Sequence, residues 1–373
     1  MPVLLAGAFG QRNPGDEALL AAFVDALRDT PLVATSSDPL ATEAAHGVEA
    51  VHSRDAWRVA RTVARASAVV FAGGTVFKTL HPNSGRRPLA LLHSALGVAA
   101  GTQATGAPLA LVGVGATHLA GRRARALAAM VVRRAGLLVL RDEESARLLA
   151  SAGAPAPFRV GADPAWTAIA PPPADGWRGD AAIVALSSLA GGPALPRRLA
   201  RVLAPLQRAG LRVRLQPWQV LGTAADDLAL ARALARELPD RAEIVPPPAT
   251  LEDAADLFTG ARVVVALRFH ALLAAAAAGV PAVAYAHEVK LAALARRLGQ
   301  RVVGPAGDPD AIGAEIAAAA RDGLAPAPRA AIERERERAG EGMALLRLLL
   351  SGGHDDDPAR VSGLELVPGG WIA

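Results

Sequence analysis

The sequence predicts an α/β protein with two domains, each built on a parallel sheet. Short apolar runs alternate with longer helical patterns along the chain, which is the signature of repeated βα units. The 373 residues exceed one typical domain, and 52% hydrophobic with only 3% aromatic residues favours alanine-rich helices packed on sheets. A proline-rich segment at 170–176 interrupts the alternation, which then starts again, so we read it as a linker.

The first half of the chain supplies the elements of an N-terminal domain, residues 1–172. Apolar runs of strand length lie at Val3–Ala6, Val69–Ala72, Ala110–Gly113 and Leu137–Leu140. Helical patterns lie between or after them at Asp16–Arg28, Ala56–Ala66, Pro88–Gly101 and Arg122–Ala135. This order predicts a Rossmann-like domain.

The second half predicts a C-terminal Rossmann-like domain, residues 178–350. Strands are expected at Ala182–Leu186, Arg212–Gln216, Glu243–Val245, Val263–Leu267 and Ala282–Tyr285. Helices are expected at Pro196–Ala209, Ala224–Glu237, Leu251–Thr259, Ala271–Ala278, Lys290–Leu298, Asp310–Arg321 and Ala330–Leu350. The polar tail, residues 351–373, is expected to be loosely held or disordered. Two such domains facing each other would form a ligand cleft at the carboxyl ends of both sheets.

Composition excludes several classes of protein. The chain has no cysteine, which rules out disulfides, thiolate zinc sites and cysteine nucleophiles. The N-terminus lacks the charged start of a signal peptide, and the longest uncharged apolar stretch, 271–286, is short for a membrane span. We therefore expect a cytoplasmic protein.

The net charge of +5 comes almost entirely from arginine. A compositional bias that replaces lysine by arginine is one explanation. An anionic ligand or an anionic membrane surface is the other. Basic runs with interleaved aromatic residues are missing, so nucleic acid is not expected as a partner.

The segment Arg268-Phe269-His270 is the strongest local indication of chemistry. It follows an apolar run at 262–267 and precedes an alanine-rich helical pattern. Side chains two residues apart on an extended segment point the same way, so Arg268 and His270 are expected to leave the strand end together. A fixed cation beside a titratable ring can hold an anion and transfer a proton to it. The segment predicts an enzyme with Arg268 and His270 as catalytic residues; a packing histidine is the alternative.

A glycine-containing turn, residues 7–17, follows the first strand. Asn13 is expected to cap the first helix, with Pro14 at its first position. Gly15 would let a ligand approach the backbone at a helix N-terminus, which favours anions. Asp16 in the first turn would compete with a bound phosphate. A capped tight turn without a ligand is the alternative.

Four further residues follow predicted strands. Paired Gly73 and Gly74 permit a left-handed or crowded backbone beside a ligand, with a plain βα turn as the alternative. Arg141 could grip a carboxylate bidentately, although a salt bridge to the following acidic residues is the alternative. His118 could reach an acceptor, or it could be an ordinary loop residue.

Two residues close this set. Asp142 is expected to act as a helix N-cap. Lys290 is a second candidate cation, with a surface lysine as the alternative. No cluster of carboxylates and histidines suggests a metal site.

Taken together and in order, these segments resemble the polysaccharide pyruvyl transferase family. The residues that carry the resemblance are Asn13-Pro14-Gly15-Asp16-Glu17, Gly73-Gly74, Arg141-Asp142 with Ser145, Ala162-Asp163-Pro164, Arg268 with His270, Gly279-Val280-Pro281, and Tyr285 with Lys290. The match runs from about Val3 to Leu298. The chain departs from the pattern at Ala72, where the family usually has a third glycine, and at 286–289, where it usually reads Asp-Pro-Lys or similar.

The resemblance implies a GT-B-like fold, phosphoenolpyruvate as donor and a saccharide diol as acceptor, with a pyruvate ketal and phosphate as products and no cofactor. The branch it looks most like modifies secondary cell-wall polysaccharide and creates anchors for S-layer proteins. The donor site would comprise Arg141, Arg268, Lys290, Asn13, Gly15, Gly73 and Gly74, and the acceptor would meet Asp16 and His118. His270 would donate the proton or orient the donor.

Several features remain open from the sequence. The acceptor could be lipid-linked, which would place the protein at the inner face of the membrane as a peripheral protein. The oligomeric state and the acceptor sugar are not defined by the sequence. A nucleotide-sugar glycosyltransferase on the same fold and a non-catalytic saccharide-binding relative are the two rival interpretations.

Overall fold

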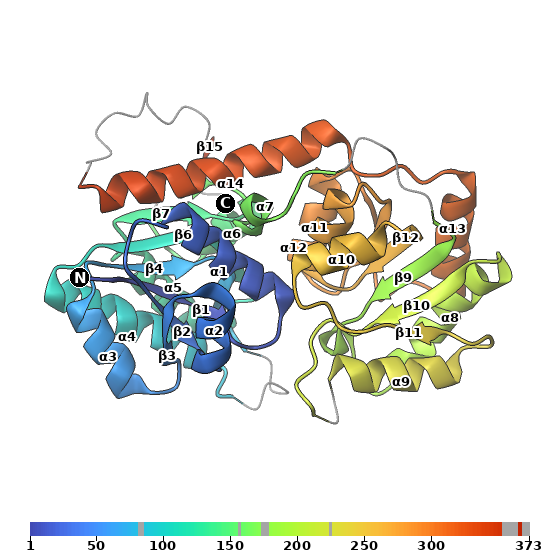
Figure 1. Ribbon diagram of the computed structural model, residues 1–373, viewed down its shortest axis with the longest axis horizontal. Helices are drawn as coiled ribbons and strands as arrows, with labels where there is room; N and C mark the ends of the chain where they lie inside the picture. The colour runs from blue at the N-terminus through green and yellow to red at the C-terminus, as the bar shows by residue number, and fades with distance from the viewer. Residues whose placement is uncertain (81–85, 156–157, 173–178, 224–225, 353–364, 368–373) are drawn as a thin grey trace. The chain divides into compact units, whose positions relative to one another are not determined.

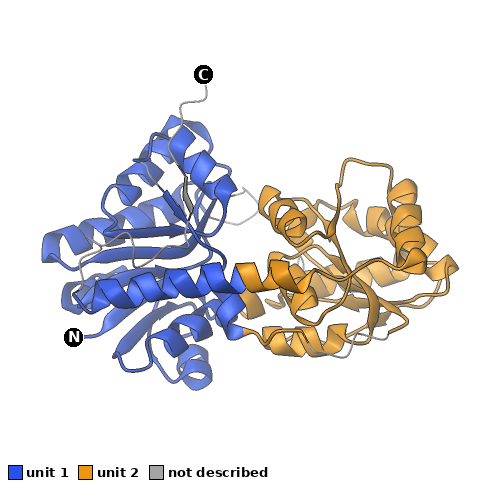
Figure 2. Cartoon of the chain, turned by 90° about the horizontal axis from the view of Figure 1, so that it is seen from above, with its two compact units in different colours: residues 1–11, 16–168, 335–373 blue, residues 12–15, 169–334 orange. Residues whose placement is uncertain are grey.

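The chain folds into two compact units in the computed structural model, which describes residues 1–80, 86–155, 158–172, 179–223, 226–352 and 365–367. Unit 1 comprises residues 1–11, 16–168 and 335–373, and unit 2 comprises residues 12–15 and 169–334 (Figure 2). The main division falls beside the predicted linker at 170–176, part of which lies outside the described residues. Residues 335–350, which the sequence assigned to the second domain, group with unit 1.

The long helix α14, Arg329–Leu350, explains that difference. From Glu335 onward the helix groups with unit 1, and it contacts side chains and backbone of that unit. Arg338 Nη2 lies 2.7 Å from a carboxylate oxygen of Glu143, and Arg336 Nη1 donates to the Trp166 carbonyl over 2.8 Å. The alternating glutamates and arginines at 333–338 suit a solvated helix face but do not indicate which unit the helix packs against.

Unit 1 contains a mostly parallel sheet with the strand order β15-β8-β7-β6-β4-β1-β2-β3, and β5 pairs with β6 (Figure 1). The strands are β1 Val3–Phe9, β2 Leu32–Ser36, β3 Glu49–His52, β4 Ala68–Ala72, β5 Thr75–Lys78, β6 Leu109–Thr117, β7 Leu137–Leu140, β8 Phe158–Val160 and β15 Glu365–Val367. The helices are α1 Pro14–Ala26, α2 Pro39–His46, α3 Ala56–Arg65, α4 Ala90–Thr105, α5 Gly121–Val132, α6 Glu143–Ser151 and α7 Ala165–Ala168.

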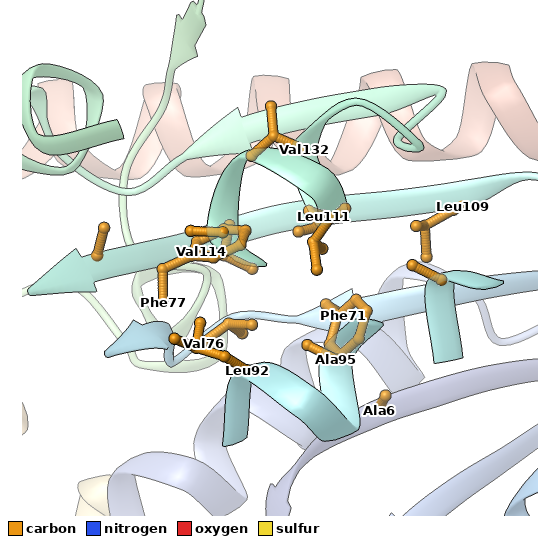
Figure 3. Close-up of a cluster of buried hydrophobic side chains, with 14 of the residues drawn as sticks. Ala6, Phe71, Val76, Phe77, Leu92, Ala95, Leu109, Leu111, Val114 and Val132 are labelled. Atoms are coloured by element: carbon orange, nitrogen blue, oxygen red, sulfur yellow. The ribbon is translucent and has the colours of Figure 1, made fainter. Parts of the chain in front are cut away.

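The central strands of this sheet are apolar throughout because helices cover both faces. Figure 3 shows part of the core, where Phe71 of β4 and Leu111 of β6 lie near Leu92 and Ala95 of α4. Burying such side chains contributes about 1.5–3 kcal/mol for each large residue. The core therefore fixes the strand ends from which the glycine turns and Arg141 leave.

Unit 2 contains a parallel sheet with the order β11-β10-β9-β12-β13-β14. The strands are β9 Ala181–Ala185, β10 Arg212–Gln216, β11 Glu243–Ile244, β12 Ala261–Ala266, β13 Ala282–Tyr285 and β14 Arg301–Val303. The helices are α8 Leu195–Arg208, α9 Asp227–Glu237, α10 Leu251–Phe258, α11 Phe269–Ala277, α12 Val289–Arg297 and α13 Pro309–Asp322, and a short 3₁₀ turn spans Ser188–Ala190. The chain order jumps from β9 to β12 at the centre of the sheet, which is a topological switch point where ligands bind in open α/β sheets.

The predicted fold class is confirmed, and every predicted helix and strand has a counterpart. The predictions omitted β2, α2, β3, β5, β8, α7 and β14, whereas the helix expected after Asp142 is α6. The omitted ones are short elements at sheet edges or with mixed polarity; β3 has exposed Glu49 and only one buried residue. The tail prediction falls mostly outside the described residues, but Glu365–Val367 forms β15, antiparallel to β8.

Candidate active site

Arg268 lies at the carboxyl end of the central strand β12, where it precedes the first turn of α11. Its Nε donates to the Leu186 carbonyl over 3.2 Å, and its Nη2 lies 2.6 Å from Asp227 Oδ2. The side chain keeps 13% of its surface exposed. Two of the three guanidinium nitrogens are thus fixed, and no hydrogen bond of the described residues uses the third, so the fork is held in one orientation.

Asp227, in the first turn of α9, organises this end of the sheet. Its side chain is 1% exposed and accepts hydrogen bonds from the backbone of Ser188 at 2.7 Å and Gln219 at 2.9 Å, besides the pair with Arg268. These partners follow β9, β10 and β12, three adjacent strands. One carboxylate therefore joins three strand-end loops and sets the position of Arg268.

His270 is the second residue of α11, which begins at Phe269. The prediction that Arg268 and His270 share one extended segment is wrong, because helical backbone already starts between them. The His270 ring stands edge-on to Phe269, with centroids 5.3 Å apart. A histidine in the first helical turn after a parallel strand still lies at the carboxyl edge of the sheet.

Residues 12–15 group with unit 2 and lie against His270. A Cβ added to Gly15 would come within 1.9 Å of His270 Nδ1, so the absence of a side chain at position 15 makes room for the ring. Asn13 Oδ1 accepts from the backbone N–H of Gly15 at 3.3 Å and from Trp218 Nε1 at 3.2 Å. Asn13 caps the first helix as predicted, and Gly15 is required by a close approach.

A second histidine, His287, follows β13, the strand beside β12. Burial of the ring lowers the pKa of His287; the Glu288 carboxylate opposes this shift, and Lys290 and then Arg268 reinforce it. Both ring nitrogens are buried and have no hydrogen-bond partner among the described residues. β12 and β13 pair in parallel, so Arg268, His287 and Lys290 all follow strand ends at the same edge of the sheet. The charges of Lys290 and Arg268 both act on the His287 ring.

Lys290 lies in the first turn of α12 and is half-buried, with its Nζ 2.9 Å from Glu288 Oε2. The Glu288 side chain is 40% exposed, so this ion pair contributes little to stability. Lys290 can therefore exchange Glu288 for another anion. The position at the end of β13 keeps Lys290 a candidate for anion binding.

In unit 1, Gly73 and Gly74 both have left-handed backbone, with φ of 70° and 72°. A Cβ at Gly73 would come within 2.7 Å of the Leu19 side chain. The Gly73 N–H donates to Val112 over 2.9 Å, and Gly74 accepts from Gly115 over 2.7 Å. The predicted left-handed, crowded backbone is confirmed. The same backbone conformation also forms the turn that leads into β5.

Arg141 is buried at the end of β7, with 2% of its side chain exposed. Its Nε lies 3.3 Å from Asp142 Oδ2, and its Nη1 lies 3.3 Å from Asp163 Oδ2. The guanidinium also covers the backbone of Gly115, where a Cβ would come within 2.5 Å of Nη2. The structure thus contains the salt bridge to Asp142 that the sequence left open as an alternative to donor binding. Asp142 also caps α6 through the Ser145 N–H at 2.7 Å, as predicted.

The two residues predicted to meet the acceptor lie in unit 1. Asp16 occupies the first turn of α1 and is partly buried. His118 follows β6, is exposed and has a left-handed φ of 37°. An acceptor role for either residue stays a prediction.

Three carboxylates in these sites were given no role by the sequence analysis, although two of them, Asp163 and Glu17, lie in segments that carry the resemblance. Asp227 and Asp163 hold Arg268 and Arg141, and Glu17 accepts the Gly10 N–H at 2.9 Å and contacts His46 Nε2 at 3.0 Å. Glu17 belongs to the Gly-Asp-Glu sequence at the first helix, which was the available signal. The partner of Asp227 is 41 residues away in sequence, and no local pattern indicates it.

Two kinds of feature are absent from the described residues. No group of three or more histidine, aspartate or glutamate side chains there is arranged to hold a metal ion. Among the same residues, no helix has the length and apolar character required to span a bilayer.

Solved structures of similar fold include a UDP-bound protein, a UDP-GlcNAc 2-epimerase and a glycosyltransferase. HepE from Anabaena, in complex with UDP, is 14% identical with a TM-score of 0.62, covering 94% of this chain and 100% of that chain. UDP-GlcNAc 2-epimerase from Methanocaldococcus jannaschii is 10% identical with a TM-score of 0.62 over 94% and 100%. A glycosyltransferase from Rickettsia africae is 10% identical with a TM-score of 0.57 over 94% and 96%. At these identities the likeness shows the fold alone, and the fold is GT-B-like.

Sequence comparison separates the chain from these neighbours. No curated protein matches it significantly. The family model described as polysaccharide pyruvyl transferase, however, matches residues 13–288, which is more than half of the chain and includes Asn13, Arg141, Arg268 and His270. The chain therefore belongs to the polysaccharide pyruvyl transferase family.

Proposed function

We propose that the protein transfers the pyruvyl group of phosphoenolpyruvate to two hydroxyls of a saccharide, forming a cyclic ketal and releasing phosphate. The observation that carries the proposal is the placement of Arg268, His287 and Lys290 after the ends of β12 and β13, with His270 in the first turn of α11. Phosphoenolpyruvate carries a carboxylate and a phosphate close together. Two fixed cations beside titratable rings suit such a compact anion.

The reaction requires one proton to be delivered to carbon and two to be removed from hydroxyls. Protonation of the methylene carbon of phosphoenolpyruvate makes its C2 electrophilic, and one saccharide hydroxyl adds there. The C2–O bond to phosphate breaks, and the second hydroxyl closes the ketal ring. The two hydroxyl protons balance the proton taken up by carbon and the one carried away by phosphate.

His270 is the candidate for the proton transfer. It follows Arg268 by two residues at the same edge of the sheet, and Gly15 leaves space for its ring. General acid–base catalysis of this kind contributes about 10²–10⁴ in rate. Arg268 would bind an anionic group of the donor through the nitrogen not used by Leu186 and Asp227, and would stabilise the charge that develops on departing phosphate.

The test measures phosphate release from phosphoenolpyruvate with a panel of glycosides bearing neighbouring hydroxyls. Release that depends on the glycoside is expected, and His270→Ala should lower its rate by about 10²–10⁴. His93→Ala, which changes an exposed histidine on α4, is the matched control and should leave the rate unchanged. Unchanged release in His270→Ala would refute the role of that residue.

A second function is favoured by one observation, the fold shared with UDP-bound HepE. A nucleotide-sugar glycosyltransferase would use the same cations for a diphosphate. Calorimetric titration separates the two, because our proposal expects binding of phosphoenolpyruvate with glycoside and none of UDP-sugars. Binding of UDP-sugars alone would reject the pyruvyl transfer.

For the acceptor, we propose a cell-wall polysaccharide precursor of the kind that later anchors S-layer proteins. The test is mass spectrometry of glycans from a deletion strain, in which ketal-linked pyruvate should be lost.

A further inference from the structure

Charge is unevenly distributed along unit 1. Between Asp55 and Asp142 the sequence contains no aspartate or glutamate, whereas it contains twelve arginines and lysines. A bias that replaces lysine by arginine explains the type of cation but not the absence of carboxylates. The same bias acts on unit 2, where α9 and α13 carry both arginines and acidic residues.

The acid-free segment forms three neighbouring helices on one face of the sheet. Successive right-handed crossovers from β3 to β4, β6 and β7 place α3, α4 and α5 on the same side. α3 packs beside α4, and α4 packs beside α5. Figure 1 shows α3 and α4 adjacent at the lower left of unit 1. We call the exposed surface of these helices the α3–α5 face, defined by Trp57, Arg58, Arg61, Arg65, Arg122, Arg123 and Arg125.

The arginines of this face lack carboxylate partners. Within the described residues only Arg58 has one, Asp55 at 3.5 Å, while Arg61, Arg65, Arg122, Arg123 and Arg125 form no ion pair. Elsewhere in the described residues, Arg201, Arg212, Arg214 and Arg301 of unit 2 are each paired with an aspartate or glutamate, although Arg232 and Arg236 on α9 are not. An unneutralised basic face attracts an extended anionic partner.

An exposed tryptophan accompanies these arginines. Trp57 is 71% exposed, and it shares one stripe of α3 with Arg61 and Arg65 at intervals of four residues. Between the two rows of arginines, the exposed residues of α4 include no arginine, lysine or carboxylate. Ser94, Gly97 and Ala100 are small, whereas His93 and Gln103 are larger and polar. Tryptophan favours the interface between lipid and water, and basic helices favour anionic headgroups.

We propose that the α3–α5 face docks the protein on a membrane surface of anionic phospholipid. Arginines of α3 and α5 contact the headgroups, the outer surface of α4 presents no carboxylate to repel them, and Trp57 inserts its ring at the interface. Nucleic acid fits less well, since a lone exposed aromatic provides no series of stacking platforms. This inference does not depend on the reaction assigned to unit 2.

The test is sedimentation of the full-length protein with vesicles. Vesicles of phosphatidylglycerol and phosphatidylcholine should bind the protein at low salt, whereas pure phosphatidylcholine should not, and binding should fall steeply as salt is raised. Arg61→Glu with Arg65→Glu should weaken binding at least 20-fold, since each arginine near an anionic surface contributes about fivefold. No binding to the anionic vesicles at low salt would overturn the proposal.

The matched control reverses two exposed arginines at the same spacing in unit 2, Arg232→Glu with Arg236→Glu on α9. This control variant has the same net charge as the α3 variant and should still bind the vesicles. If the control lost as much vesicle binding as the α3 variant, binding would depend on total charge and not on the α3–α5 face. Trp57→Phe should abolish the blue shift of tryptophan emission on vesicles, and a persisting shift would exclude Trp57 as the anchor. If the protein binds RNA but not the vesicles, the partner of this face is nucleic acid and the inference is overturned.

Discussion

Arg141 in unit 1 and Arg268 in unit 2 occupy equivalent positions, since each follows a buried parallel strand and pairs with buried aspartate. Arg141 is 2% exposed and lies between two carboxylates, those of Asp142 and Asp163. Arg268 is 13% exposed and pairs with Asp227, whose remaining hydrogen bonds come from backbone N–H groups. The charge of Arg141 is thus compensated within the protein, whereas the surroundings of Arg268 include further cations.

This difference shows how one local sequence pattern serves two purposes. A buried guanidinium between two carboxylates joins the ends of β7 and β8 to each other. Arg268 has one carboxylate partner where Arg141 has two, it lies near Lys290 and His287, and its unused nitrogen can bind an anionic donor. We therefore expect Arg141 to matter for stability and Arg268 to matter for donor binding, and the predictions below test that assignment.

The largest expected effect is on stability, in Arg141→Leu. The substitution leaves Asp142 and Asp163 without their cation in a buried setting, which costs about 3–5 kcal/mol. Chemical denaturation monitored by circular dichroism measures the loss. A stable Arg141→Leu protein with impaired donor binding would reverse the assignment and return Arg141 to the donor site. Arg133→Leu, at an exposed arginine of the same unit, is the control and should change stability by less than about 0.5 kcal/mol.

The next effect is on catalysis, in Arg268→Lys. Lysine retains the charge but loses the fork that contacts Leu186 and Asp227, so its ammonium cannot hold the same position. We expect kcat/KM for phosphoenolpyruvate to fall by about 10²–10³, as for loss of one fixed donor of charge-stabilising hydrogen bonds. Steady-state phosphate release gives this ratio. If Arg268→Lys instead unfolds the protein while keeping donor affinity in the folded fraction, the two arginines do not differ as proposed.

A smaller effect is expected from Gly15→Ala. The new methyl group would occupy the space of the His270 ring, so the ring must move away from Gly15. We expect kcat to fall by about tenfold to a hundredfold, since a displacement of about 1 Å costs that much in a positioned site. Gly192→Ala is the control because a Cβ there meets no atom within 4 Å. Equal activity of both variants would show that the position of His270 is not critical.

Sequence reasoning predicted the architecture well because buried parallel strands are continuous apolar runs. β7, β10 and β13 were predicted with their observed bounds. It missed β3 because this short edge strand has an exposed glutamate, Glu49, and only one buried residue, so it lacks a continuous apolar run. Local hydrophobicity therefore identifies central strands and loses edge strands.

The candidate site could be predicted only where a residue follows its own strand. Arg268, His270, Arg141 and Lys290 were found in this way. The contact of Gly15 with His270 and the bonds of Asp227 join segments that are distant in sequence, and no local pattern encodes them. Long-range pairing decides which arginine is neutralised, so the distinction between Arg141 and Arg268 required the structure.

The smallest effect concerns the pH dependence of stability, through His287. Burial lowers the pKa of this histidine below its ordinary value of about 6.5, Glu288 opposes the shift, and Lys290 and Arg268 reinforce it. Below about pH 6.5 the unfolded chain therefore binds a proton at His287 that the folded protein does not yet accept. Folding stability falls as the pH is lowered through this window, until the folded pKa is reached.

His287→Gln removes this proton while keeping a polar side chain, so the variant should lose less stability than the parent between pH 7 and pH 5. The measurement is the denaturation midpoint at each pH, compared with His118→Gln, an exposed histidine as control. A steeper acid loss in His287→Gln would contradict a neutral His287 in the folded protein. If phosphoenolpyruvate binds beside this ring, its negative charge should raise the pKa of His287, so saturating donor should reduce the difference between His287→Gln and the parent. If the difference between the variant and the parent is unchanged by the donor, the donor does not bind at the ends of β12 and β13. The cations near Arg268 would then not explain why Arg268 and Arg141 differ in function.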